Sequence, residues 1–319
     1  MPVAEIAIDE DLVRNLLNAA SVEQGLDRRL AAQPLHLVAN GWDNVMYRLG
    51  SGHMVRLPRR AVAVPLVEHE QRWLPEIADQ LPVSVPVPVF AGRPVHSPDV
   101  SFPWPWSIVP WFEGEPLGTR TLDAVESSML AQDLAAFLHS LHFPSPSDAP
   151  TNPFRGVPLS TRSDRTSSHL GDGSVIGKSI GSKRAERLRS RWAEALAAPT
   201  WDREPRWLHG DLHALNLVWH HGRLAAVIDF GDITGGDPAT DLAVAWSLFP
   251  DPVDRDQFQD LARIDNNAVD NPTWSRARGW ALAVAAAIVT RSADNPALHE
   301  IGTRTLIAVA EDDDGAFET

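Results

Sequence analysis

The spacing of apolar residues changes along the chain and predicts two different kinds of structure. Across residues 9–30 apolar side chains recur at helical spacing, which predicts an amphipathic helix. Three short strands are then predicted at residues 35–38, 44–49 and 53–57. The last two are joined by Gly-Ser-Gly, which is typical of a hairpin. The first part of the chain is therefore expected to contain an antiparallel sheet.

The remainder of this first part adds one helix and one strand. Residues 64–81 have helical spacing, interrupted at Pro75. The proline-rich residues 82–88 cannot form a regular central strand, because proline donates no ladder hydrogen bond. Residues 106–112 are predicted to be an edge strand or the final strand. We therefore expect a small α+β lobe over the first 110 or so residues.

A polar stretch with glycine and proline at residues 113–117 predicts a hinge, and hence domains at 1–112 and 113–319. The second domain is expected to be mainly helical, with helices at 122–141, 182–196, 238–249, 272–290 and 296–310. Residues 144–181 are predicted to be a long loop, a kind of segment that is usually functional or mobile. Two small strands at 217–219 and 224–228 interrupt the helices. The predicted fold class is α+β, with a small N-terminal lobe and a large helical C-terminal lobe.

Composition narrows the class of protein further. The 319 residues are 44% hydrophobic and 22% charged, as in ordinary globular proteins. Cysteine is absent, which excludes disulfide scaffolds and thiolate chemistry. The net charge of −14 disfavours a nucleic-acid partner. The longest apolar run, residues 280–289, is too short for a membrane span, and the acidic N-terminus does not resemble a signal peptide, so a cytoplasmic location is expected. The acidic tail after Glu311 is expected to fray.

One segment carries a recognisable set of chemical groups. Asp211 follows an apolar strand, Asn216 lies five residues later, and Asp229 ends the next apolar strand. A chain that returns through one hairpin is expected to bring these three polar ends together. Phosphoryl transfer requires such a set, because one carboxylate accepts the proton of the attacking hydroxyl while an amide oxygen and a second carboxylate hold Mg²⁺. The alternative for Asp211 and Asn216 is an Asx-type turn pair.

The motifs His-Gly-Asp-Leu-His-x-x-Asn at 209–216 and Ile-Asp-Phe-Gly-Asp at 228–232 resemble the aminoglycoside phosphotransferase family, which has a protein-kinase-like fold. The resemblance extends over residues 35–305 or so. It implies that Asp211 is the catalytic base, that Asn216 and Asp229 are the Mg²⁺ ligands, and that ATP or GTP is the phosphoryl donor.

The nucleotide is expected to bind the small lobe. Residues 40–44 lie where the family places its phosphate-covering loop, which makes Gly41 and Asn44 candidates, although a plain hairpin turn is the alternative. The hinge backbone at residues 109–112, including Val109 and Trp111, is expected to meet the base of the nucleotide.

Kinases carry a lysine on the third strand, paired with a helix glutamate over the phosphates. This chain has only two lysines, Lys178 and Lys183, and both lie far beyond that strand. Arg56 stands in the right place, with Glu70 as its candidate partner and Glu68 as the second choice. Arg56 could instead be a surface residue of the strand.

We expect the residues beside the motifs to have structural or supporting roles, some of which stay open. His209 is expected to pack the loop, whereas His213 could contact either the loop or the substrate. Asp232 could support the metal or simply be solvated. Asp241 is expected to hydrogen-bond the backbone of the catalytic loop. Two further residues lie outside this group: Asp237 is expected to cap a helix with Pro238 at its first position, and Trp274 lies near the expected substrate cleft by resemblance, although packing is its commoner role.

Two other sequence features resemble functional motifs. Residues 171–179, GDGSVIGKS, resemble a P-loop, but the first glycine that the motif requires is Asp172 and no apolar strand precedes it. We interpret this segment as a mobile loop. The paired histidines His220 and His221 lie in a turn with no carboxylate at metal-ligand spacing and are expected to be solvated.

The expected acceptor is a small hydroxylated molecule. Only eight residues separate Asp229 from Asp237, which leaves no room for the activation segment of a protein kinase, so no protein substrate is expected. Residues 111–319 carry a net charge of −11, which suits a cationic antibiotic such as an aminoglycoside but could serve solubility alone. A sugar or amino-alcohol kinase is the nearest alternative. A nucleotide-binding pseudokinase and a P-loop NTPase centred on Lys178 are the others.

Overall fold

The computed structural model describes residues 3–292 and 295–312. The chain divides into two compact units, which are described separately. Unit 1 consists of residues 1–79, 84–113 and 228–231, and unit 2 contains the rest. The short segment 228–231 thus belongs to unit 1 although the chain on either side of it belongs to unit 2. No helix among the described residues has both the length and the apolar character needed to cross a membrane.

Unit 1 is built on an antiparallel sheet of five strands in the order β1-β2-β3-β7-β4. These strands are β1 Leu35–Asn40, β2 Asn44–Leu49, β3 His53–Pro58, β4 Phe90–Gly92 and β7 Trp106–Pro110. The predicted hairpin joins β2 to β3, with Leu49 opposite His53. β7 is the last strand of this sheet in the chain, which is one of the two alternatives predicted, and it lies between β3 and β4 rather than at the edge. The true edge, β4, is too short for a periodicity signal.

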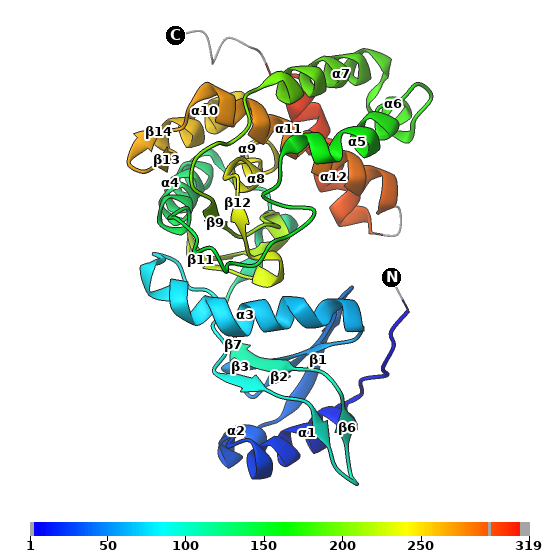
Figure 1. Ribbon diagram of the computed structural model, residues 1–319, viewed down its shortest axis with the longest axis vertical. Helices are drawn as coiled ribbons and strands as arrows, with labels where there is room; N and C mark the ends of the chain where they lie inside the picture. Colours follow the sequence, from blue (N-terminus) through cyan, green and yellow to red (C-terminus); the bar gives the residue numbers. More distant parts are fainter. Residues whose placement is uncertain (1–2, 293–294, 313–319) are drawn as a thin grey trace. The chain divides into compact units, whose positions relative to one another are not determined.

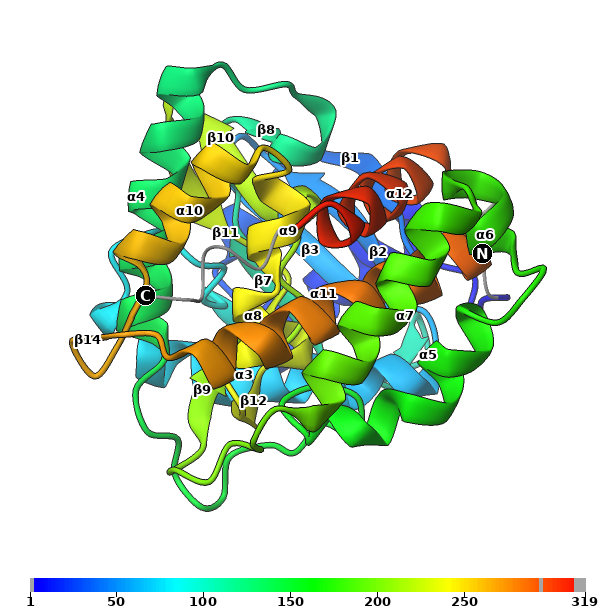
Figure 2. The same ribbon diagram turned by 90° about the horizontal axis from the view of Figure 1, so that it is seen from above.

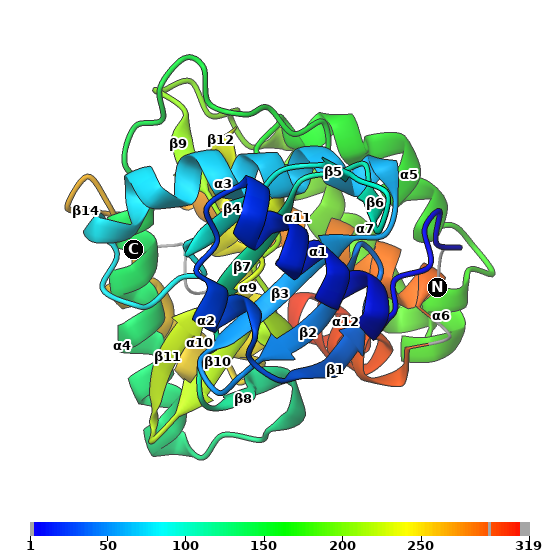
Figure 3. The ribbon, with the colours of Figure 1, turned by 90° about the horizontal axis from the view of Figure 1, so that it is seen from below.

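Helices cover both faces of this sheet (Figures 1 and 3). The helices are α1 Glu10–Glu23, α2 Arg28–Ala31, the 3-10 turn η1 Ala61–Ala63 and α3 Val64–Ile77, which is followed by the 3-10 turn η2 Ala78–Gln80. The predicted single helix over 9–30 is two helices, because the Asp27 carboxylate accepts the N–H groups of Arg29 and Leu30 and starts a new one. Pro75 lies inside α3 without ending it. Apolar residues of α1 and the sheet form one buried core. A small ribbon of β5 Val95–His96 and β6 Ser101–Phe102 completes the unit.

Unit 2 is mainly helical, as predicted. Its helices are α4 Ala124–Leu141, α5 Ser163–His169, α6 Val175–Ile180, α7 Ser182–Ala197, α8 Ala239–Leu242, α9 Val244–Leu248, α10 Pro252–Leu261, α11 Asn271–Arg291 and α12 Pro296–Ala310. α7, α11 and α12 pack on one another (Figure 2). The apolar run at 280–289 lies in the C-terminal half of α11 and is mostly buried, as its length indicated. The predicted helix over 238–249 is split into α8 and α9.

Short strands and 3-10 turns carry the loops of unit 2. The 3-10 turns are η3 Leu117–Thr119, η4 Leu159–Arg162, η5 Ala214–Asn216 and η6 Phe230–Asp232, the last of which begins in unit 1. The strand pairs are β9 Arg206–Leu208 with β12 Thr234–Gly236, β10 Leu217–His220 with β11 Arg223–Val227, and β13 Arg263–Ile264 with β14 Asn267–Ala268. β8 Glu115–Pro116 adds to β10, so part of the expected hinge is a strand.

Two segments, one predicted to be a loop and the other a frayed tail, contain residues with defined structure. The segment 144–181 contains η4, α5 and α6, and the residues that resemble a P-loop end in α6, whose first turn is capped by the Ser174 hydroxyl on Gly177 N–H. Asp312, the first part of the expected frayed tail, is buried and pairs with Arg255 and Arg278. Residues 313–319 of that tail lie outside the described residues.

Candidate functional site

A buried carboxylate holds the backbone of the loop that carries Asp211. The loop leaves β9, and the Asp241 carboxylate of α8 accepts the N–H groups of His209 and Gly210 at 2.8 and 2.9 Å. The Asp241 side chain also lies 3.2 Å from His142 Nε2, and these contacts keep the pKa of Asp241 below its usual range although burial alone would raise it. The predicted role of Asp241 is confirmed. A side chain at Gly210 would meet the Asp232 carbonyl oxygen at 2.3 Å, so only glycine fits there.

The Asp211 carboxylate is ionised and partly accessible. Its side chain is 33% exposed. Arg155 donates to Oδ1 at 2.8 Å, and His213 Nε2 lies 3.6 Å from Oδ2. Burial would raise the pKa of Asp211, but the His213 ring and the Arg155 guanidinium outweigh it and hold that pKa well below its usual range. Asp211 therefore presents a deprotonated carboxylate that can accept a proton from a bound hydroxyl.

The ring of His213 and the amide of Asn216 are both oriented by this loop. His213 Nδ1 accepts the Leu215 N–H at 3.2 Å, and its Nε2 atom lies between Asp211 Oδ2 at 3.6 Å and the Asn216 amide nitrogen at 3.4 Å. The Asn216 amide N–H₂ group donates to the Asp211 carbonyl oxygen at 2.9 Å. This hydrogen bond leaves the Asn216 Oδ1 atom as an oxygen ligand. The predicted proximity of Asp211 and Asn216 is confirmed.

Asp229 lies in unit 1, where Arg56 joins it to Glu70. Arg56 Nη1 donates to both Glu70 oxygens at 2.8 and 2.9 Å, and Arg56 Nη2 donates to Asp229 Oδ1 at 2.9 Å. The expected partner of Arg56 is thus Glu70, and Glu68 is exposed. Asp229 has φ of +67°, an uncommon conformation for a residue other than glycine.

Burial and charge act in opposite directions on this pair. Burial alone would lower the pKa of Arg56, but Glu70 and Asp229 raise it. Burial raises the pKa of Glu70, and Arg56 offsets only part of that effect. The guanidinium is therefore permanently charged and holds Asp229 and Glu70 in one network. Arg56 is not a surface residue, because only 7% of it is exposed.

The other residues predicted to bind the nucleotide also lie in unit 1. Gly41 N–H donates to the Asn44 carbonyl across the turn between β1 and β2, and the buried Asn44 Oδ1 atom has no hydrogen-bond partner among the described residues. Val109 is buried in β7. The Trp111 N–H donates to the Gly52 carbonyl at 2.9 Å, so that donor is already engaged. The Trp111 ring lies under the Arg48 guanidinium, 4.0 Å from its centre.

The remaining predicted residues have clear positions. Trp274 is 4% exposed and packs edge-on against Trp246 and Phe258, so it is a core residue and not a substrate contact. His209 is fully buried, and its Nδ1 atom accepts the Asp211 N–H, which is the structural role expected of it.

Two further carboxylates, Asp232 and Asp237, are paired with side chains that the sequence did not indicate. Asp232 accepts a hydrogen bond from Asn152 at 2.6 Å, so it is not simply solvated. Asp237 accepts the N–H of Ala239, which begins α8 one residue later than predicted. The same carboxylate forms a buried pair with Arg276. The burial of Arg276 could not be read from the sequence.

Sequence reasoning did not identify Arg155, Asn152 or His142 as parts of this region. Arg155 and Asn152 come from the predicted long loop and have no characteristic spacing from Asp211. His142 lies at the end of α4, 99 residues before Asp241. No sequence signal pointed to these residues, because three arginines in residues 144–181 are no more than the average for the chain. Such contacts between distant segments need the fold to become visible.

The donor atoms of Asn216 and Asp229 fit Mg²⁺ in type. They supply an amide oxygen and a carboxylate oxygen, which Mg²⁺ prefers, and the Asp229 side chain is 54% exposed. In the part of the chain that the structure describes, no three His, Cys, Asp or Glu side chains form a metal site of their own. Mg²⁺ in phosphotransferases uses one or two protein ligands together with substrate phosphates, so each of these residues offers a ligand of the required type.

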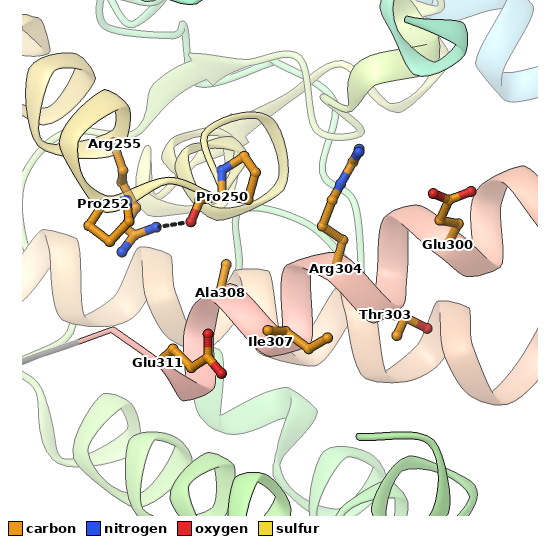
Figure 4. A pocket seen from close by; sticks show the side chains of 9 residues that line it. All are labelled: Pro250, Pro252, Arg255, Glu300, Thr303, Arg304, Ile307, Ala308 and Glu311. Carbon is orange, nitrogen blue, oxygen red and sulfur yellow. Dashed lines mark hydrogen bonds between the residues drawn. The ribbon is translucent and has the colours of Figure 1, made fainter. Parts of the chain in front are cut away.

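A separate pocket of about 490 Å³ lies beside α12 in unit 2 (Figure 4). It is lined by Pro250, Pro252, Arg255, Glu300, Thr303, Arg304, Ile307, Ala308 and Glu311. The Arg255 guanidinium donates to the Pro250 carbonyl on its wall. None of the residues predicted from the sequence to bind or react lines this pocket.

Comparison with known proteins places the chain in a family. A model described as the phosphotransferase enzyme family matches residues 34–280, and the protein therefore belongs to that family of enzymes. No curated protein sequence matches the chain.

Solved structures share the fold at low sequence identity. The GDP complex of aminoglycoside 2'-phosphotransferase-IIIa is 17% identical with a TM-score of 0.66, covering 95% of this chain and 99% of its own. The ternary complex of APH(2")-IIa with streptomycin and ATP is 18% identical with a TM-score of 0.54, covering 87% and 90%. The apoenzyme of macrolide 2'-phosphotransferase MphH from Brachybacterium faecium is 20% identical with a TM-score of 0.53, covering 92% and 97%. The predicted α+β, kinase-like fold is confirmed.

Proposed function

We propose that this protein transfers the γ-phosphoryl group of ATP or GTP to a hydroxyl group of a small molecule in the presence of Mg²⁺. The observation that carries the proposal is the state of Asp211, a deprotonated and partly exposed carboxylate on a loop fixed by the buried Asp241. A general base needs this combination of charge, access and fixed position. Membership of the phosphotransferase enzyme family supports the same reaction.

We assign one step to each group. Asp211 orients the acceptor hydroxyl and accepts its proton while the acceptor oxygen forms a bond to the γ-phosphorus. The bond from that phosphorus to the bridging oxygen of the nucleoside diphosphate breaks in line with the attack. Arg56, held by Glu70, faces the donor phosphates with a permanent positive charge. Asn216 and Asp229 would hold Mg²⁺, which neutralises charge that develops on the phosphate oxygens.

We assign the nucleotide to unit 1 and the acceptor to unit 2. Unit 1 contains Arg56, Glu70 and the turn at Gly41 and Asn44, and unit 2 contains Asp211. This assignment gives one substrate to each of the two predicted domains, the nucleotide to residues 1–112 and the acceptor to residues 113–319. The P-loop alternative is not supported, because Lys178 is an exposed residue inside α6, which follows α5 and not a strand. The pseudokinase alternative rested on Arg56, and Arg56 makes the glutamate pair that a kinase lysine makes.

We propose aminoglycosides and macrolides as the first acceptors to test, because the structural neighbours are named for these substrates. Hydroxylated metabolites such as sugars and amino alcohols form the second set. The neighbours include GDP and ATP complexes, so both nucleotides belong in the assay.

The test is a mass-spectrometric transfer screen. Purified protein, Mg²⁺ and ATP or GTP are incubated with each acceptor, and a product heavier by one phosphoryl group is expected. Omission of Mg²⁺ should abolish the product. Binding of the nucleotide without transfer of its γ-phosphoryl group to any acceptor of either set would contradict the proposal and favour a binding module.

A further inference from the structure

Backbone groups of the long segment between α4 and α7 form hydrogen bonds with β12. The Thr234 hydroxyl donates to the Pro150 carbonyl at 2.8 Å, and the Gly235 N–H donates to the same carbonyl at 3.2 Å. The Asn152 N–H donates in turn to the Thr234 hydroxyl at 3.1 Å. Residues 150–152 are thereby fixed against β12, the strand that pairs with β9 before Asp211.

The other end of this segment is fixed just as closely. The Asp237 N–H donates to the Gly156 carbonyl at 3.0 Å, and the Gly156 N–H donates to the Thr240 hydroxyl at 3.1 Å. Gly156 has φ of +66°, and a side chain there would meet Leu208 at 2.9 Å and Gly236 at 3.1 Å. Only glycine allows the two backbones to approach this closely. The three residues between these anchors are therefore held in place from both sides.

Arg155 lies between the two anchors and reaches Asp211. Its Nη2 atom donates to Asp211 Oδ1 at 2.8 Å, and the arginine side chain is 19% exposed. The next anchor residue, Asn152, donates to Asp232 at 2.6 Å and accepts the Phe154 N–H at 2.8 Å, which fixes the turn before Arg155. The arginine thus extends from a backbone held by hydrogen bonds on both sides, and it donates to Oδ1 of the carboxylate.

We propose that Arg155 is a positioning residue for Asp211, which fixes the carboxylate so that Oδ2 and the free lone pair of Oδ1 face the acceptor hydroxyl. This inference rests on the proposed function of Asp211 as the base. A carboxylate oxygen that accepts one hydrogen bond can accept another, so Arg155 does not block the reaction. Because side-chain rotation of an unrestrained aspartate would misplace the accepting lone pair, the fixed orientation raises kcat without contributing to acceptor binding.

The test compares four variants with the wild type in steady-state kinetics. Arg155→Gln should lower kcat by about ten- to a hundredfold, the effect of one charge-assisted hydrogen bond, with acceptor and nucleotide KM within about twofold. Arg155→Lys should recover part of kcat, because it retains the cation without the planar fork. Arg155→Ala should gain activity when guanidinium is added at millimolar concentration. Arg162→Gln, a nearby change that leaves the Asp211 contact intact, should behave as wild type.

Other results would overturn the proposal. A higher acceptor KM with unchanged kcat would make Arg155 an acceptor-binding residue. A higher kcat in Arg155→Gln would make the contact inhibitory. A lower melting temperature with unchanged kcat per folded molecule would reduce Arg155 to a structural role. Should Arg155→Gln not fold, the kcat and KM of Arg155→Lys decide between the same outcomes.

A spectroscopic measurement separates failure of this inference from failure of the proposed function. In ¹⁵N-labelled protein the Arg155 guanidinium should give slowly exchanging N–H signals that are lost in Arg155→Lys and move in Asp211→Ala. Absence of these signals in the wild type would refute the pairing whether or not transfer is observed. Full transfer by Asp211→Asn, with the signals present in the wild type, would instead refute the assignment of Asp211 as the base.

Discussion

Removal of the Asp241 carboxylate should destabilise the protein and disorder the loop that carries Asp211. This side chain is fully buried and accepts the N–H groups of His209 and Gly210. In Asp241→Ala both donors lose their acceptor, and each buried unpaired donor costs about 1–3 kcal/mol. The His142 contact is lost as well, so we expect a loss of about 3–5 kcal/mol. Asp241→Asn retains one acceptor oxygen and should lose about 1–3 kcal/mol.

Urea unfolding followed by tryptophan fluorescence measures this loss, with Asp202→Ala as the matched control. Asp202 is an exposed aspartate in the same unit, and its removal should change the free energy of unfolding by less than about 0.5 kcal/mol. An Asp241→Ala protein with the stability of that control would refute the reasoning. It would mean that the loop backbone does not depend on the buried carboxylate.

The lowered pKa of Asp241 also predicts that its contribution to stability depends on pH. The pKa of Asp241 is lower in the folded protein than its ordinary value of 3.8, so its ionised form stabilises the fold. The stability difference between wild type and Asp241→Asn should be complete above about pH 4 and should shrink as the pH falls through the folded pKa. A difference that grows on acidification would contradict the assigned cause.

Three further predictions follow from the other buried contacts. Asp237→Ala leaves the buried Arg276 without its carboxylate and should cost about 3–5 kcal/mol in urea unfolding, whereas the double change with Arg276→Met should recover most of it. Gly156→Ala should lower the free energy of unfolding by about 1–3 kcal/mol, because the φ of Gly156 is +66° and a Cβ would meet Leu208 at 2.9 Å. Gly173→Ala, which has open space around it, should lower that free energy less in the same assay. Arg56→Lys should fold but lose about tenfold in kcat/KM for the nucleotide, since one ammonium cannot reproduce all the hydrogen bonds of the guanidinium. An unchanged kcat/KM would show that the positive charge alone is sufficient.

The elements with strong local signals were predictable from the sequence. The hairpin of β2 and β3 and the long helices α4, α7, α11 and α12 have regular apolar spacing over many residues. Shorter elements were not predictable in this way. β4 and β8 contain three and two residues, and hydrogen bonds to distant strands define them rather than any local pattern.

The candidate site was predictable where motif residues lie close in the sequence. Asp211 and Asn216 are five residues apart, and the third-strand position of Arg56 pointed to a helix glutamate. Arg155 was not predictable, because 56 residues separate it from Asp211 and its position depends on backbone contacts of the intervening segment. Trp274 shows the opposite case: the resemblance placed it near substrate, but its packing against other aromatic side chains buries it.

The central claim is that Asp211 is the base of a phosphoryl transfer, and one paired measurement tests it most directly. Wild type and Asp211→Asn are assayed side by side for phosphorylated acceptor and for nucleotide binding with Mg²⁺, with Asp202→Asn as the control for removing an exposed carboxylate. The account predicts that Asp211→Asn binds nucleotide like the wild type and transfers about 10²- to 10⁴-fold more slowly, the range of general-base catalysis. Transfer at the wild-type rate by Asp211→Asn would contradict it.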